Sequence, residues 1–165
     1  MRSVVLAALG IGAALLAVAA CDGRGRAPEA ARPTGETAAL PAGPTERSDG
    51  EEFAVEARHE AAATVGQATT AVFVGTAKGS WHVNVEYPAK LEVLAAEGFT
   101  VAKTVLRKED AAQFDEQQLR FDVPLTPTRA GELPVEFKFK FGLCSGDRCV
   151  TREAVLRWTY AVGGG

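Results

Sequence analysis

The sequence predicts an all-β domain over its last two thirds, on three observations. All 8 Phe, both Trp and both Tyr residues lie after residue 50. In this stretch apolar residues alternate with polar ones at a period of two, which is typical of strands that bury one face. Glycine and proline turn signals separate about eight such runs. Short strands at this spacing favour an antiparallel β-sandwich of the immunoglobulin type.

The alternation and the turn signals place each element in turn. The expected strands are 53–57, 69–76, 81–85, 91–94, 99–105, 119–125, 135–141 and 156–162. The run 135–141 is the clearest, because large apolar residues occupy every odd position and charged residues every even one. The turn signals are Lys78-Gly79-Ser80, Tyr87-Pro88, Glu97-Gly98, Thr126-Pro127 and Ala130-Gly131. Residues 107–118 favour a short helical excursion that bridges the sheets.

The N-terminus has the pattern of a secretory signal. Arg2 supplies a positive start, and residues 3–20 are uncharged and apolar, a run also long enough for a short membrane helix. It ends in Val18-Ala19-Ala20-Cys21, which resembles the lipobox of bacterial lipoproteins. The resemblance implies a signal peptide over 1–20 and lipid attachment at Cys21. The alternatives are an uncleaved anchor and an ordinary signal with an incidental cysteine.

Residues 21–50 are expected to be the lipidated cysteine and a linker. They hold half of the prolines, and Leu40 is their only large aliphatic residue. Such a segment buries too little apolar surface to offset its ordering entropy, so it is predicted to be disordered. We expect it to act as a spacer between the membrane and a folded domain over 51–162.

Charge and composition exclude several classes of function. The 18 Lys and Arg residues face 21 Asp and Glu residues, for a net charge of -3. The chain therefore lacks the basic surplus with which nucleic-acid binders neutralise phosphates. With 3 cysteines and 2 histidines, a four-ligand zinc site would need nearly all of them. We expect no nucleic-acid partner, no cofactor, no metal and no small-molecule substrate.

Cys144 and Cys149 flank a turn-forming loop between the last two expected strands. Opposed hairpin positions lie about 4.5–5.5 Å apart, within disulfide range, and an oxidising compartment favours the bond. Closing so short a loop stabilises by only about 2 kcal/mol in the chain-entropy model, and a hairpin tip is accessible to another protein's thiolate. A structural disulfide, an exchangeable pair, and metal-bound or free thiols all stay open on these residues.

Two motifs of the domain carry a family resemblance. Trp81-His82-Val83-Asn84 is followed by Tyr87-Pro88-Ala89-Lys90 and Glu97-Gly98, and Phe139-Lys140-Phe141-Gly142-Leu143-Cys144 is followed by Cys149. Together they resemble the N-terminal periplasmic domain of the DsbD family of thiol:disulfide interchange proteins, over about residues 52–162. The resemblance implies an immunoglobulin-like fold, a reversible dithiol at Cys144 and Cys149, and transfer of reducing equivalents to oxidised periplasmic proteins.

The sequence departs from that family after the second cysteine and in its domain content. Val150-Thr151-Arg152 follows Cys149 in place of the family's proline-rich stretch. The family's membrane electron-carrying domain and its C-terminal thioredoxin-like domain do not follow either. The resemblance therefore implies a separate electron donor.

Weaker motifs favour structural roles. The segment 142–146 has the spacing of a hydrolase nucleophile elbow, but a strand is expected after it rather than a helix. His59-Glu60 begins like a zinc-protease motif, but position 63 is Ala, so the second ligand is missing. His82 would complete a copper or zinc site only if it converged with the two cysteines. The basic residues Lys138, Lys140, Arg152 and Arg157 predict a solvated sheet face.

The sequence thus predicts a bacterial lipoprotein that is lipid-anchored in the cell envelope and faces the periplasm, with the choice of inner or outer membrane left open. Its expected function is thiol–disulfide exchange with the thiols and disulfides of periplasmic proteins, and Cys144 and Cys149 are the candidate catalytic residues. The alternative is a non-enzymatic binding or scaffold lipoprotein in which the same pair is a structural disulfide.

Overall fold

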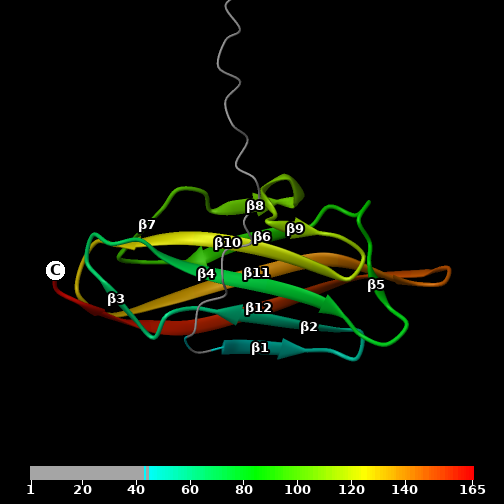
Figure 1. The fold of residues 1–165 in the computed structure, drawn as a ribbon, viewed down its shortest axis with the longest axis horizontal. Helices are drawn as coiled ribbons and strands as arrows, with labels where there is room; N and C mark the ends of the chain where they lie inside the picture. The colour runs from blue at the N-terminus through cyan, green and yellow to red at the C-terminus, as the bar shows by residue number, and fades with distance from the viewer. Residues whose placement is uncertain (1–42, 44) are drawn as a thin grey trace, which may run out of the picture. The chain divides into compact units, whose positions relative to one another are not determined.

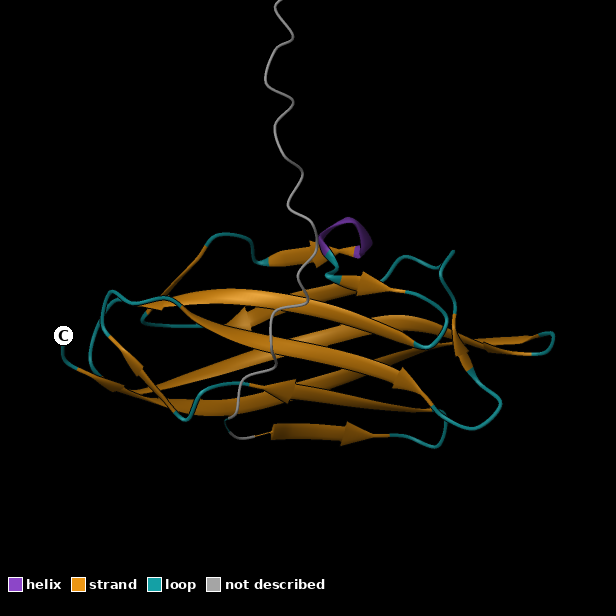
Figure 2. Cartoon of the chain, in the orientation of Figure 1, coloured by secondary structure: helices purple, strands orange, loops and turns teal. Residues whose placement is uncertain are grey.

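The computed structural model describes residue 43 and residues 45–165, which form an all-β fold (Figures 1 and 2). The strands are β1 (Thr45–Asp49), β2 (Phe53–Arg58), β3 (Ala62–Thr64), β4 (Thr69–Ala77), β5 (His82–Val83), β6 (Lys90–Ala95), β7 (Phe99–Val101), β8 (Val105–Arg107), β9 (Gln113–Phe114), β10 (Gln118–Pro127), β11 (Gly131–Ser145) and β12 (Arg148–Gly163). A 3₁₀ turn, η1 (Lys108–Asp110), lies between β8 and β9. No helix among the described residues is long and apolar enough to cross a membrane.

The strands form two six-stranded sheets. The first has the order β1-β2-β4-β10-β7, with β9 also paired to β10, and the second has the order β3-β12-β11-β6-β8, with β5 also paired to β11. Neighbouring strands are antiparallel except β3, which runs parallel to β12. The expected immunoglobulin-like antiparallel β-sandwich is therefore confirmed. The tip of the long β11–β12 hairpin projects at one end of the domain, and the C-terminus lies at the other end (Figure 1).

The core lies between the two sheets and is built from the inward residues of the period-two pattern. On β11, Val135 is 2% exposed, and Phe137, Phe139 and Phe141 are 0% exposed. Aromatic rings contact each other across the gap between the sheets. The Phe73 and Phe137 centroids lie 4.7 Å apart, and those of Phe121 and Phe139 lie 5.6 Å apart. The alternation in the sequence therefore identified the buried face of β11 correctly.

The outward positions of the second sheet are charged and paired. The four basic residues singled out in the sequence each have an acidic partner: Lys138 with Glu92, Lys140 with Glu153, Arg152 with Glu52 and Arg157 with Glu136. Hydrogen bonds from Lys90 and then Lys138 lower the pKa of the Glu92 carboxyl. The basic stripe is thus a solvated face with its charges balanced by carboxylates, and such solvent-screened pairs contribute little to stability.

The folded domain begins before the predicted boundary at residue 51. Residues 45–49, which were expected in the linker, form β1 and pair with β2 from Thr45↔Arg58 to Asp49↔Ala54. β1 is an edge strand without large apolar residues, and Arg47 forms an ion pair with Glu56 on the neighbouring strand. Polar, charged edge strands have the composition of a linker, which is why composition alone placed the boundary too late.

The helical excursion expected over 107–118 is wrong beyond its first turn. Only Lys108–Asp110 is helical, and the rest consists of turns around the two-residue strand β9, up to the start of β10 at Gln118. Aspartate side chains hold the turns here. The Asp110 carboxylate accepts a hydrogen bond from the Arg107 N–H at 2.9 Å, and Asp115 accepts one from the Gln118 N–H at 2.9 Å. Such local bonds compete with helix formation.

The run 99–105 also divides, because its two halves join different sheets. β7 pairs with β10 in the first sheet, and β8 pairs with β6 in the second. The run 81–85 shortens to the two residues of β5. The short strand β3 was not expected, and its three residues include no large apolar side chain.

Candidate functional site

The candidate site lies at the tip of the β11–β12 hairpin. The two strands pair without interruption from Gly131↔Val162 to Ser145↔Arg148, which leaves Gly146 and Asp147 as a two-residue turn. Gly146 has a φ of 55°, in the left-handed region that two-residue hairpin turns require and glycine adopts without strain. The turn therefore fixes the register that places Cys144 directly opposite Cys149.

The two cysteines form a disulfide bond. Their sulfur atoms lie 2.04 Å apart and their Cα atoms 4.1 Å apart. The bond joins strands that already pair along their whole length, and the sequence separation is only 5 residues. The prediction that Cys144 and Cys149 are bonded to each other is confirmed. In this structure the two sulfurs are therefore neither free thiols nor metal ligands.

The two sulfur-bearing residues differ in their exposure. Cys144 is 6% exposed, whereas Cys149 is exposed to solvent. The difference follows from the topology, because Cys144 is on the strand that β5 covers, where it pairs with His82. Cys149 is on β12, whose outer edge carries β3 only at Ala161–Gly163. Of the two residues, Cys149 is therefore the more accessible to solvent.

A cleft of about 330 Å³ opens beside the disulfide. It is lined by His82, Val83, Asn84, Val85, Glu86, Glu116, Cys144, Gly146 and Cys149. The segment after β5 is held by Asn84, whose Oδ1 accepts a hydrogen bond from the Glu86 N–H at 3.0 Å. The Val83 N–H donates a hydrogen bond to the Glu116 carbonyl oxygen at 2.8 Å, and this bond joins β5 to the turn before β10. The cleft is thus framed by segments from both sheets.

The hairpin tip is also tied to the segment that precedes β5. The Ser80 and Ser145 hydroxyl oxygens lie 2.9 Å apart in a hydrogen bond. The Arg148 guanidinium lies over the Trp81 ring, 5.6 Å from its centroid, which is within the range of a cation–π interaction. Sequence reasoning missed these contacts, although it had singled out Trp81-His82-Val83-Asn84 as a motif. The motif supplies one side of the site.

Gly142 allows the loop after β5 to approach β11 closely. A Cβ atom at this position would lie 2.7 Å from the Cβ and Cγ atoms of Tyr87. Only glycine leaves room for Tyr87 to pack directly on the strand two residues before Cys144. The glycine that resembled part of a nucleophile elbow therefore has a packing role within a continuous strand.

Neither candidate histidine motif forms a metal site. Among the residues described by the structure, no group of three His, Cys, Asp or Glu side chains is placed to hold a metal ion. His82 does converge with the cysteines, but both sulfurs are in the disulfide. His59 is a core residue: it is 3% exposed, stacks on Trp158 at 4.4 Å between centroids, and its Nδ1 lies 2.8 Å from the Glu60 carbonyl oxygen.

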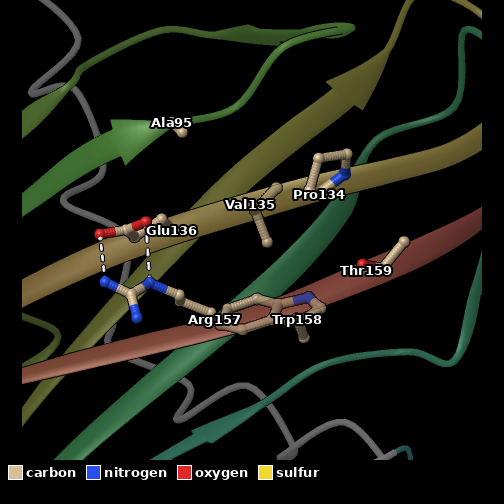
Figure 3. Close-up of a pocket in the computed structure, with 7 residues that line it drawn as sticks. All are labelled: Ala95, Pro134, Val135, Glu136, Arg157, Trp158 and Thr159. Atoms are coloured by element: carbon tan, nitrogen blue, oxygen red, sulfur yellow. Dashed lines mark hydrogen bonds and ion pairs between the residues drawn. The ribbon is translucent and has the colours of Figure 1, made fainter.

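A second hollow, of about 320 Å³, lies on the outer face of the second sheet (Figure 3). Figure 3 shows Glu136 and Arg157 joined across one end of it, and their ion pair measures 2.8 Å. This hydrogen bond lowers the pKa of the Glu136 carboxyl. The two charged groups of this hollow form an ion pair with each other, and no cysteine or histidine lines it, so the hairpin tip is the stronger candidate.

The predicted signal peptide, the lipid-attachment residue Cys21 and most of the predicted linker lie outside the described residues. The structure therefore bears on the candidate catalytic pair, Cys144 and Cys149, and on the domain that carries it.

Comparisons with known proteins show likeness only at the level of structure. No family model matches the chain, and no curated protein matches its sequence. The GAE domain of yeast GGA1 is 8% identical, with a TM-score of 0.41, and covers 68% of this chain and 96% of its own. A cohesin module from a family 33 glycoside hydrolase of Clostridium perfringens is 14% identical, with a TM-score of 0.42, and covers 74% and 100%. The GAE domain of GGA2p from Saccharomyces cerevisiae is 12% identical, with a TM-score of 0.37, and covers 70% and 96%.

Proposed function

We propose that this protein is a membrane-anchored periplasmic thiol–disulfide exchange module that passes reducing equivalents to partner proteins through Cys144 and Cys149. The observation that carries the proposal is the position of the disulfide. It crosses one pair of facing residues at a projecting hairpin tip, where one cysteine is exposed and the other is buried. This combination suits an exchange reaction, because a partner can reach one sulfur while the other lies beside it to resolve the mixed disulfide.

The exchange begins at Cys149. In the reduced protein, the Cys149 thiolate attacks a sulfur of the partner's disulfide, forms a mixed disulfide and releases the partner's first thiolate. The Cys144 thiolate then attacks Cys149 Sγ, which re-forms the Cys144–Cys149 bond and releases the second partner thiolate. Two electrons pass to the partner, which takes up two protons, and the pair ends oxidised. An upstream dithiol protein reverses these steps and restores the reduced pair.

The exposure difference predicts an asymmetry between the two single-cysteine variants. Cys144→Ser keeps the exposed Cys149 and removes the resolving thiol, so mixed disulfides with partners should accumulate. Cys149→Ser keeps only the buried Cys144 and should trap at least about tenfold less, since trapping depends on access to the attacking sulfur. Both variants should be expressed in the native periplasm and compared on non-reducing gels for high-mass bands that reductant removes.

The variant lacking both cysteines is the matched control for that experiment and should give no such bands. If neither single variant traps a partner, thiol–disulfide exchange is not the function. Stronger trapping by Cys149→Ser than by Cys144→Ser would instead contradict the assignment of Cys149 as the attacking residue.

Membrane anchoring is tested at Cys21. The motif that ends at this residue predicts that Cys21→Ser abolishes lipidation, because the cysteine at the end of a lipobox is the residue that takes the lipid. Detergent phase partitioning should then move the variant from the detergent phase to the aqueous phase, while a Cys149→Ser control partitions like the parent. Retention of the Cys21→Ser protein in the detergent phase would contradict lipid attachment at this residue.

A further inference from the structure

His82, Cys144 and Cys149 form one row across three strands. β5 pairs with β11 so that His82 faces Cys144, and β11 pairs with β12 so that Cys144 faces Cys149. Residues directly opposite each other in antiparallel strands project from the same face of the sheet, with Cβ atoms about 4.5–5.5 Å apart. The imidazole and the buried sulfur are therefore neighbours on one face. All three residues also line the cleft beside the disulfide.

The environment of His82 leaves its ring nitrogens open. The side chain is half-buried, and within residues 45–165 its imidazole makes no hydrogen bond to another group. The charged groups that line the same cleft are Glu86, from the loop after β5, and Glu116, from the turn before β10. Arg148 lies over Trp81, on the segment that precedes β5. The imidazole therefore shares its cleft with two carboxylates.

We propose that His82 donates and accepts the proton of the Cys144 sulfur, an inference that rests on the exchange function proposed above. When a partner thiolate attacks Cys149 Sγ, the Cys144–Cys149 bond breaks and its electron pair stays on Cys144 Sγ. The His82 imidazolium stabilises this thiolate and exchanges its proton with the sulfur, so that the thiolate–imidazolium and thiol–imidazole forms are both populated in the reduced protein. In the resolving step the imidazole holds the proton, and the Cys144 thiolate attacks Cys149 Sγ. One S–S bond breaks and one forms in each step, and the proton cycles between the two residues.

The thiolate of a buried cysteine needs a neighbouring imidazolium more than the thiolate of an exposed cysteine does. Cys144 is 6% exposed, so water stabilises its thiolate poorly, whereas solvent reaches Cys149. Burial in apolar surroundings disfavours a thiolate, and an adjacent imidazolium favours it. His82 therefore makes Cys144 able both to leave in the first step and to attack in the second.

The test is a titration of the Cys144 thiol in the full chain. With Cys21→Ser and Cys149→Ser in place, Cys144 is the single cysteine, and the ultraviolet absorbance of its thiolate can be followed against pH. Adding His82→Gln should move the midpoint of this titration upward, so that the thiolate fraction at neutral pH falls about tenfold. Glu116→Gln is the matched control from the same cleft; because it removes a negative charge, it should not raise the midpoint.

An unchanged midpoint in His82→Gln would overturn the proposal, and so would an equal rise in both variants.

A second measurement needs no substitution at His82. In the protein with its native cysteine pair, the NMR titration of the His82 imidazole should shift when the disulfide is reduced, and an unchanged titration would likewise overturn the proposal. Neither measurement uses a partner protein. If the single-cysteine variants trap no partner but His82→Gln raises the titration midpoint of Cys144, only the exchange function is rejected. If they trap partners but the midpoint does not change, only the role of His82 is rejected.

Discussion

Phe139→Ala is expected to lower the free energy of unfolding by about 3–5 kcal/mol. Phe139 is 0% exposed and reaches across the gap between the sheets. Its ring lies 5.6 Å from that of Phe121 and 5.1 Å from that of Phe141, measured between centroids, and it fills the space above Gly75. Truncation removes this apolar contact and leaves a cavity that neighbouring strands cannot close. Urea denaturation, followed by tryptophan fluorescence, would give the difference in the free energy of unfolding between Phe139→Ala and the parent protein.

The adjacent residue provides the matched control. Lys138 projects from the opposite face of β11 and forms a 3.0 Å ion pair with Glu92, in which both side chains are partly exposed. Lys138→Ala should therefore cost less than about 1 kcal/mol. Equal losses from the two substitutions would mean that the inward and outward faces of β11 are assigned wrongly.

Replacing both Cys144 and Cys149 with Ala is expected to lower the free energy of unfolding by about 2 kcal/mol. This is the second largest effect on stability, after that of Phe139→Ala. The disulfide closes a loop of only a few residues, so it removes little entropy from the unfolded chain. The hairpin also keeps its register without the bond, since β11 and β12 pair from Gly131↔Val162 to Ser145↔Arg148. Chemical denaturation of the double variant, and of the reduced parent protein, should give similar losses.

Failure of the double variant to fold would contradict this account. Removal of a structural disulfide from a small secreted domain costs about 2–5 kcal/mol and often abolishes folding. A loss at the upper end of that range would mean that the hairpin depends on the bond, as the binding or scaffold alternative requires. A small loss leaves the bond free to open and close during exchange.

Strand prediction from the sequence succeeded where burial alternates strictly and failed where pairing is decided by distant residues. β11 was predicted because each of its inward residues is large and apolar. β1 was missed because a polar edge strand has no such signal and forms only through its register with β2. The run 107–118 was misassigned because Asp110 and Asp115 close turns through side-chain hydrogen bonds, which period counting does not detect.

The site was predictable in part, for the same reason. The spacing of Cys144 and Cys149 around a glycine turn was enough to predict that they face each other in a hairpin. The difference in their exposure was not predictable, because Cys144 is covered by β5, which lies about sixty residues earlier in the chain. The approach of Tyr87 to Gly142 and the placement of His82 beside Cys144 likewise depend on long-range pairing.

The reduction potential of the Cys144–Cys149 disulfide tests the exchange function most directly. It can be measured by equilibrating the purified protein with defined ratios of reduced and oxidised glutathione or dithiothreitol and quantifying the free thiols. An exchange module is predicted to have a potential in the range of known exchange catalysts, about -120 to -270 mV. A potential below about -300 mV, which is typical of structural disulfides, would contradict the account and leave the pair as a structural bond of a binding or scaffold domain.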